Sequence, residues 1–183
     1  MNYENLYRQN LETNLKGRYI TLNDIEPLLL QFNSDNQVQI IGKSVLEKPI
    51  YKYELGTGKI KVLLWSQMHG DESTATMALF DIFNYLKTNK ELLSKLNLHF
   101  IPMLNPDGAE KFTRRNALDV DINRDALRLQ SPESRVLKGA RDSLNAVFGF
   151  NLHDQSKYYN AERTEKAATI SFLAPAYNYE KTI

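Results

Sequence analysis

The sequence of 183 residues contains no cysteine. This absence excludes disulfide bonds, thiolate metal ligands and a cysteine nucleophile, so histidines and carboxylates must hold any metal. An excess of charge is also lacking, because 23 Lys and Arg residues stand against 22 Asp and Glu, and the formal net charge is +1. Such a near-neutral chain gives no electrostatic reason to expect nucleic acid or an anionic membrane as a partner.

Long hydrophobic runs and linkers are absent too. Apolar runs such as residues 28–30 and 62–65 are far shorter than the roughly 18 residues that cross a bilayer. The first ten residues lack the basic and apolar regions of a secretory signal, so we expect a cytoplasmic protein. No linker rich in Gly, Ser or Pro divides the chain, and we expect one domain over 1–183, with 1–36 as a helical lead-in.

What the chain does have is an alternation of strand-like and helix-like segments. Continuous or alternating apolar residues predict strands at 38–45, 50–55, 61–68, 98–104 and 148–152. Apolar residues three and four positions apart predict helices within 2–32, after 73 and after 131. Strands that alternate with helices predict an α/β fold, in which helices cover both faces of a sheet.

Two of the three histidines directly follow predicted buried strands. Ligands of α/β proteins collect at the carboxyl ends of strands, where His69 and His153 stand, whereas His99 lies inside a strand and is interpreted as structural. Glu72 follows His69 by three residues, and Gly70 between them allows a tight turn. Two imidazoles and a carboxylate are a standard catalytic zinc set. The alternative for Glu72 is a first-turn acid that complements a helix dipole.

The segment 114–125 is rich in Arg, Asn and Asp. It is either a solvated loop of mixed charge or an anion clamp, because arginine binds carboxylates bidentately and asparagine adds a neutral donor. Asp121 could accept a proton from the second nitrogen of a zinc-bound histidine and so orient the ring.

Together these motifs resemble the zinc carboxypeptidases of the carboxypeptidase A type, from about residue 38 to at least 159. The motifs are His69-Gly70-Asp71-Glu72, Asn105-Pro106-Asp107-Gly108, Arg114 with Asn116, 120–124, and Asn151-Leu152-His153. The resemblance implies a three-layer α/β/α sandwich around a mixed, mostly parallel sheet. It also implies one zinc ion per chain and removal of the C-terminal amino acid from peptides with a free C-terminal carboxylate.

The resemblance assigns a role to each matching residue. His69, Glu72 and His153 match the zinc ligands, and Asp121 matches the partner of the first histidine. Arg114 matches the arginine that polarises the scissile carbonyl and stabilises its oxyanion.

Two further positions, Asn123 and Arg124, match the pair that holds the substrate's terminal carboxylate. Asp154 stands where digestive members of the family carry serine, so a different substrate preference is expected. In relatives the peptide bond that matches Asp154–Gln155 is strained, and an unusual conformation is expected there.

The family's general base, a glutamate far downstream of the last zinc ligand, has no match at the family's distance. Only Glu162, Glu165 and Glu180 remain as acids of that type. We therefore expect the N-terminal portion of a catalytic domain, incomplete at its C-terminus and inactive by itself, with the base beyond Ile183. A sheet that lacks its later strands would expose apolar surface, so a homo-oligomer is a further expectation.

Two other functions remain open. One is a zinc amidohydrolase similar to succinylglutamate desuccinylase and aspartoacylase, although the turn at 105–108 followed by 114–116 favours the peptidase. The other is a zinc-binding interaction module without turnover.

Overall fold

The computed structural model describes residues 2–154. Its helices are α1 (Tyr3–Asn10), α2 (Leu22–Leu30), α3 (Thr74–Thr88), α4 (Glu91–Lys95), α5 (Pro106–Lys111) and α6 (Pro132–Leu144), with a 3-10 turn, η1, at Ile122–Arg124. Its strands are β1 (Val38–Lys43), β2 (Pro49–Leu55), β3 (Ile60–Ser66), β4 (Leu96–Ile101) and β5 (Phe148–Leu152).

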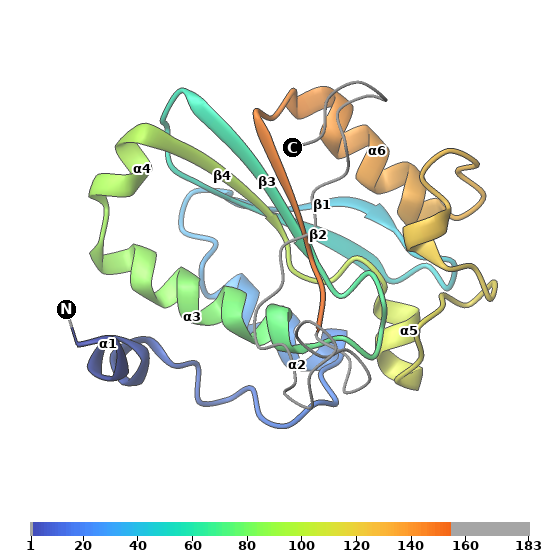
Figure 1. Cartoon of the computed structure of the whole chain (residues 1–183), viewed down its shortest axis with the longest axis horizontal. Coiled ribbons are helices and arrows are strands. Elements are labelled where there is room, and N and C mark those ends of the chain that lie inside the picture. The colour runs from blue at the N-terminus through green and yellow to red at the C-terminus, as the bar shows by residue number, and fades with distance from the viewer. Residues whose placement is uncertain (1, 155–183) are drawn as a thin grey trace, which may run out of the picture. The chain divides into compact units, whose positions relative to one another are not determined.

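The five strands form one mixed sheet in the order β1-β2-β4-β3-β5 (Figure 1). The α/β class and the mixed sheet are thus confirmed. Four of the five described strands run in one direction, because β2 is antiparallel to both β1 and β4, while β3 is parallel to β4 and β5. The expected mostly parallel sheet is therefore confirmed, with β2 as the strand that runs against the others. Strand β2 turns back along β1 through a tight turn in which the Ser44 N–H donates to the Lys48 carbonyl, since so short a connection can join only antiparallel strands.

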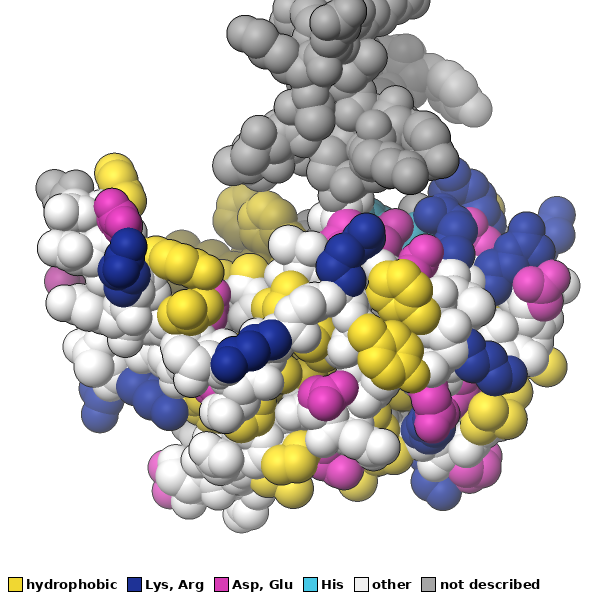
Figure 2. Space-filling view, turned by 90° about the horizontal axis from the view of Figure 1, so that it is seen from below, with side chains coloured by type: hydrophobic (Ala, Val, Ile, Leu, Met, Phe, Trp, Pro, Cys, Tyr) yellow, Lys and Arg dark blue, Asp and Glu magenta, His cyan; other side chains and the backbone are white. Residues whose placement is uncertain are grey.

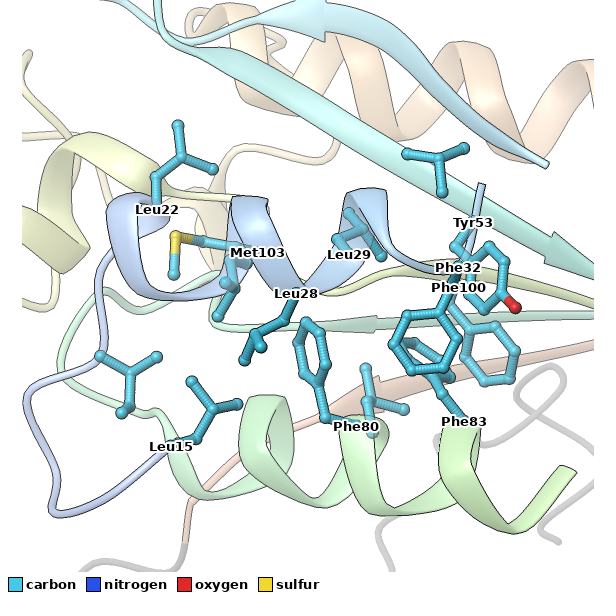
Figure 3. Packing of buried hydrophobic residues seen from close by; sticks show 14 of the residues in the cluster. Leu15, Leu22, Leu28, Leu29, Phe32, Tyr53, Phe80, Phe83, Phe100 and Met103 are labelled. Carbon is cyan, nitrogen blue, oxygen red and sulfur yellow. The ribbon is translucent and has the colours of Figure 1, made fainter. Parts of the chain in front are cut away.

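Helices α2 and α3 cover one face of the sheet with an aromatic core (Figure 3). Phe83 of α3 lies at its centre, with ring centroids 4.8 Å from Tyr53 and 4.9 Å from Phe100, both edge-on. Phe32 and Phe80 pack against the same ring. Because edge-on aromatic pairs add to the stability that burial provides, this cluster fixes α3 on the sheet.

Helix α6 covers the opposite face, so the three-layer arrangement is confirmed (Figure 1). Its Val136 and Ala140 pack against Leu63 and Ile101 of the sheet. The helix begins where the sequence predicts, because the Ser131 hydroxyl accepts the N–H of the first turn and proline occupies the first helical position.

The surface carries charges of both signs close together. On the face shown in Figure 2, basic and acidic side chains are interspersed, in agreement with the net charge of +1. Within residues 2–154, no helix has the length and apolar character needed to cross a membrane.

Candidate metal centre

A tight turn after β3 carries His69 and Glu72. The side-chain amide of Gln67 holds this turn, because its nitrogen donates to the carbonyl oxygens of Gly70, at 3.0 Å, and Ile20, at 2.9 Å. The Glu72 N–H donates to the carbonyl of His69 at 3.1 Å. The turn therefore brings both side chains to one side before α3 begins.

Gly70 allows this turn to lie directly against the start of α5. A Cβ added to Gly70 would lie 2.0 Å from the carbonyl carbon of Gly108 and 2.3 Å from the backbone nitrogen of Ala109. The need for glycine is therefore the close approach of two backbones.

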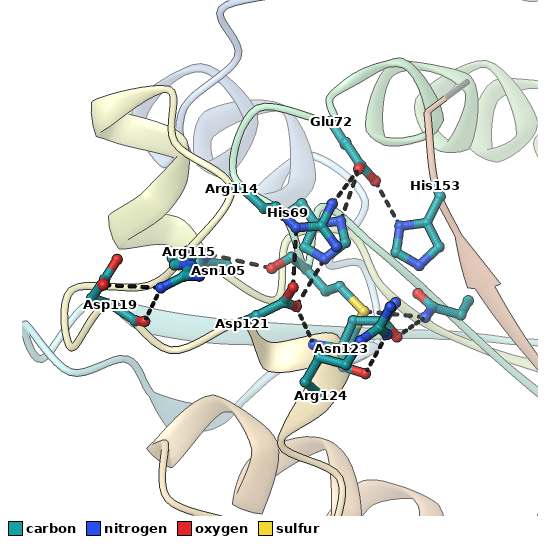
Figure 4. Close-up of polar contacts among 12 residues, drawn as sticks. His69, Glu72, Asn105, Arg114, Arg115, Asp119, Asp121, Asn123, Arg124 and His153 are labelled. Carbon is teal, nitrogen blue, oxygen red and sulfur yellow. Dashed lines mark hydrogen bonds and ion pairs between the residues drawn. The ribbon is translucent and has the colours of Figure 1, made fainter. Parts of the chain in front are cut away.

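The parallel pairing of β3 and β5 brings His153 beside His69 (Figure 4). The Glu72 carboxylate lies between the two rings, 2.8 Å from Nδ1 of His69 and 2.6 Å from Nδ1 of His153. One ligand atom from each of the three residues lies within 4.8 Å of the others. His99 lies in β4, apart from this cluster, as its structural interpretation expects.

The second nitrogen of His69 is held by Asp121. His69 Nε2 lies 3.1 Å from Oδ1 of Asp121, whose Oδ2 accepts from Nε of Arg114 at 3.0 Å. When Nε2 carries the proton that is donated to Asp121, the lone pair of Nδ1 faces a Glu72 oxygen. Two facing lone pairs repel, so the arrangement calls for positive charge at this point, which either a proton on Nδ1 or a metal ion supplies.

The two carboxylates of the centre are both stabilised in the ionised form. Burial raises the pKa of Glu72, but hydrogen bonds from His153 and His69 outweigh burial and lower the pKa to about 2. Burial likewise raises the pKa of Asp121, while hydrogen bonds from His69 and Arg114 bring it below its ordinary value. An ionised Glu72 is suited to a metal ion, because carboxylate ligands bind when deprotonated.

The donor set fits zinc. Two imidazole nitrogens and one carboxylate oxygen leave a coordination position open, as in catalytic zinc sites, and the Asp121 carboxylate behind His69 is the usual support for a ligating histidine. His69 is 1% exposed, so its ring is held rigidly in this orientation.

Arg114 lies at the edge of the cluster. Its Nη1 is 3.6 Å from Oε1 of Glu72, and its side chain is 45% exposed, so it faces both the cluster and solvent. The structure therefore joins Arg114 and Asp121 to the three predicted ligands.

Asn123 and Arg124 lie on η1, next to Asp121. The Asn123 side-chain oxygen accepts from Asn151 Nδ2 at 3.3 Å, and its backbone N–H donates to Asp121. Nη1 of Arg124 donates to the backbone carbonyl of Asn123 at 3.3 Å, and no ion pair of Arg124 occurs among the described residues. Both residues lie near the cluster, but of the two only Asn123 forms a hydrogen bond with Asp121, the partner of His69.

The end of β4 supplies no ligand. Asp107 is buried and turned away from the histidines, since its carboxylate accepts from the Ser44 hydroxyl at 2.9 Å and the Leu46 N–H at 3.0 Å.

Expectations for Glu162, Glu165, Glu180 and the Asp154–Gln155 peptide bond lie outside the described residues.

Asp125, just after η1, gives a pH-dependent contribution to stability. Burial raises its pKa, but N–H donors of Ser131 and Gln130 bring the pKa below its ordinary value. We expect Asp125→Asn to lower the free energy of unfolding at pH 7 by about 2 kcal/mol, since hydrogen bonds to a charged group are lost.

This contribution must vanish in acid. A depressed native pKa stabilises the fold above the unfolded value of about 3.9, and the stabilisation is lost as pH falls through the native pKa. Urea unfolding from pH 7 to below 3.9 should show the wild type converging on the variant. Exposed Asp119→Asn is the control, with a change below about 0.5 kcal/mol. A gap that persists in acid would contradict the prediction.

Comparison with known proteins identifies the family to which the chain belongs. The zinc carboxypeptidase family model matches residues 26–168. Carboxypeptidase SOL1 of Arabidopsis thaliana is 26% identical over 201 residues, which cover 87% of this chain and 40% of the relative. Carboxypeptidase 2 of Trichophyton tonsurans is 31% identical over 116 residues, 61% of this chain and 20% of the relative.

Solved structures agree in fold. A metallo-carboxypeptidase from Burkholderia cenocepacia has a TM-score of 0.64 at 22% identity, with 72% of this chain and 40% of that one covered. Carboxypeptidase A from Helicoverpa armigera has a TM-score of 0.65 at 17% identity, with 85% and 53% covered. The chain spans less than half the length of the two curated relatives named above. Since the family model matches well over half of the chain, the chain belongs to the zinc carboxypeptidase family.

Proposed function

We propose that this chain carries the zinc site of a metallocarboxypeptidase, and that the whole protein hydrolyses the C-terminal peptide bond of peptides. The observation that carries the proposal is the convergence of His69, Glu72 and His153, with Asp121 behind the first histidine. These three residues would hold the ion. When bound, zinc supplies a Lewis acid that polarises a carbonyl and lowers the pKa of a water molecule.

The protein's own side chains support the reaction in two ways. Asp121 holds the proton on Nε2 of His69, so that Nδ1 stays free to act as a ligand. Arg114, at the solvent-facing edge, would donate to the carbonyl oxygen as negative charge develops there, and its 3.6 Å distance from Glu72 supports this role. A donor of this kind is worth about 3–4 kcal/mol in the transition state.

The substrate's terminal carboxylate is assigned to Arg124 and Asn123. Arginine forms bidentate hydrogen bonds with a carboxylate. To bind one, the guanidinium of Arg124 would have to break only a 3.3 Å hydrogen bond to the backbone carbonyl of Asn123. A peptide bound at this point would present its last peptide bond toward Arg114 and the histidines.

Zinc titration with peptide assays tests the function. In competition with a chromophoric chelator, we expect the protein to bind one zinc ion per chain. We also expect the whole protein to hydrolyse peptides that have a free terminal carboxylate and to leave amidated peptides intact. Failure to bind zinc, or equal hydrolysis of both peptides, would contradict the proposal.

Arg124→Ala isolates recognition of the carboxylate. The Kd for a peptide with a free C-terminus should rise about 10- to 100-fold, because a hydrogen-bonded charge pair is lost, while the Kd of the amidated peptide should stay the same. Calorimetry on the zinc-loaded protein measures both values. Arg128→Ala removes a positive charge from the same surface depression and should leave both values unchanged. An equal loss for the two peptides in Arg124→Ala would show a structural role.

A further inference from the structure

Glu133 is a fully buried carboxylate that the proposed reaction does not use. It lies in the first turn of α6 and is 0% exposed. Its Oε1 accepts from the Val45 N–H at 3.1 Å, and its Oε2 accepts from Nδ2 of Asn116 at 2.9 Å. No Lys or Arg pairs with it in the part of the chain that the structure describes. Burial of a carboxylate without a cationic partner is costly, so the hydrogen bonds from Val45 and Asn116 have to offset that cost.

What Glu133 holds is the amide of Asn116. The side-chain oxygen of Asn116 accepts the N–H groups of Leu118 and Val120, both at 3.0 Å, and its backbone N–H donates to the Val120 carbonyl at 3.1 Å. A flipped amide would point its NH₂ group at two donors, so the acceptor at Glu133 fixes the only orientation that closes this loop.

The two ends of that loop lie on the metal centre. Arg114 precedes Asn116 by two residues, and Asp121 directly follows Val120. Asp121 in turn contacts Arg114 and the Nε2 of His69. Hydrogen bonds therefore lead from Glu133 through Asn116 to Val120, and after the peptide bond from Val120 to Asp121 a further hydrogen bond reaches His69, the first predicted ligand.

We propose that Glu133 is a positioning residue of the metal centre, which acts through Asn116 to hold Asp121 against His69. The inference rests on the proposed function, since it concerns the same centre. It adds a residue from α6, on the opposite face of the sheet from α3, to the parts that set the geometry of the ligands.

Glu133→Gln is the test variant, because it keeps the size of the side chain but leaves one acceptor oxygen for two donors, the Val45 N–H and the Asn116 NH₂ group. One donor must then face the new NH₂ group, and the contact that anchors the loop is weakened. We expect zinc affinity to fall about 10-fold or more, as when support behind a ligating histidine is lost. In the metal-free protein, the NMR signal of the His69 Nε2 proton should shift or broaden.

Adding Asn116→Asp to Glu133→Gln should restore both properties. The new carboxylate can accept from Leu118, Val120 and the new amide, so every hydrogen bond is kept and only the charge has moved. If Glu133→Gln alone fails to fold, the double variant still tests the proposal. A double variant that folds but binds zinc about 10-fold more weakly than the wild type would overturn it.

Asp107→Asn is the matched control. Asp107 is equally buried and holds the same 44–46 turn, but it does not contact Asn116. It should lower the melting temperature while zinc affinity and the His69 signal stay native.

The outcomes separate the two proposals. Equal loss of zinc affinity in Asp107→Asn and Glu133→Gln, or a native His69 signal in Glu133→Gln, would overturn the positioning role. If the wild type binds no zinc, the proposed function fails, and the metal-free His69 signal still tests Glu133.

Discussion

His153→Ala is expected to lower zinc affinity more than about 100-fold. Loss of support behind a ligand costs 10- to 100-fold, and loss of a ligand must cost more. The Nδ1 of His153 lies 2.6 Å from Glu72, so its removal also takes one hydrogen bond from that carboxylate. Because the side chain is 30% exposed at the end of β5, the fold should tolerate the change. Chelator competition measures the affinity directly.

A second histidine provides the control for this result. His99→Gln changes a buried histidine of β4 that lies apart from the cluster, so zinc affinity should stay native even if stability falls. The zinc-dependent rise in melting temperature, a measure of ligand binding to the native state, should disappear in His153→Ala and persist in His99→Gln. An unchanged affinity in His153→Ala would remove this residue from the metal centre.

The position of the candidate metal centre can be predicted from the sequence because it depends on local patterns. Buried strands are visible as apolar runs, and a histidine at the end of each of two such runs lies at one edge of a parallel pair. The same reasoning fails at the end of β4. There, Asp107 also follows a buried strand, but its side chain turns toward the 44–46 turn, a contact that only the folded chain creates.

The helices show where local patterns are insufficient. The pattern of residues 2–32 predicts helices, and α1 and α2 lie there, but it does not predict the non-helical stretch 11–21 between them, in which Leu15 and Ile20 are buried. Helix α5 replaces an expected turn. Asn105 caps it and Pro106 occupies its first position, two ordinary start signals, but Gly108 inside such a short helix obscures them.

Strand order and the role of Glu133 depend on distant contacts. Nothing in the alternation of β2 indicates that it pairs antiparallel with both β1 and β4. Glu133 follows Pro132 at a helix start, where an exposed acid is the ordinary expectation. Its burial comes from contact with Asn116 and Val45, which are far away in sequence. Residues that position a site are thus harder to predict than residues that form it.

Gly70→Ala is expected to have the largest effect on the fold. The added methyl group would lie 2.0 Å from the carbonyl carbon of Gly108, and both backbones at this point are fixed. The side chain of Gln67 holds the first, and Asn105 caps the helix that carries the second. Since neither can move without loss of hydrogen bonds, the free energy of unfolding should fall by about 3 kcal/mol or more.

The same substitution should weaken zinc binding, because any shift of the turn moves His69 relative to Glu72. Gly139→Ala is the control: a Cβ at this exposed helical position meets nothing within 4 Å, and alanine should stabilise α6 by about 0.5–1 kcal/mol. Urea unfolding and chelator competition on both variants compare the two effects. A Gly70→Ala protein with native stability and zinc affinity would show that the turn and α5 can separate freely, and that their contact does not set the ligand geometry.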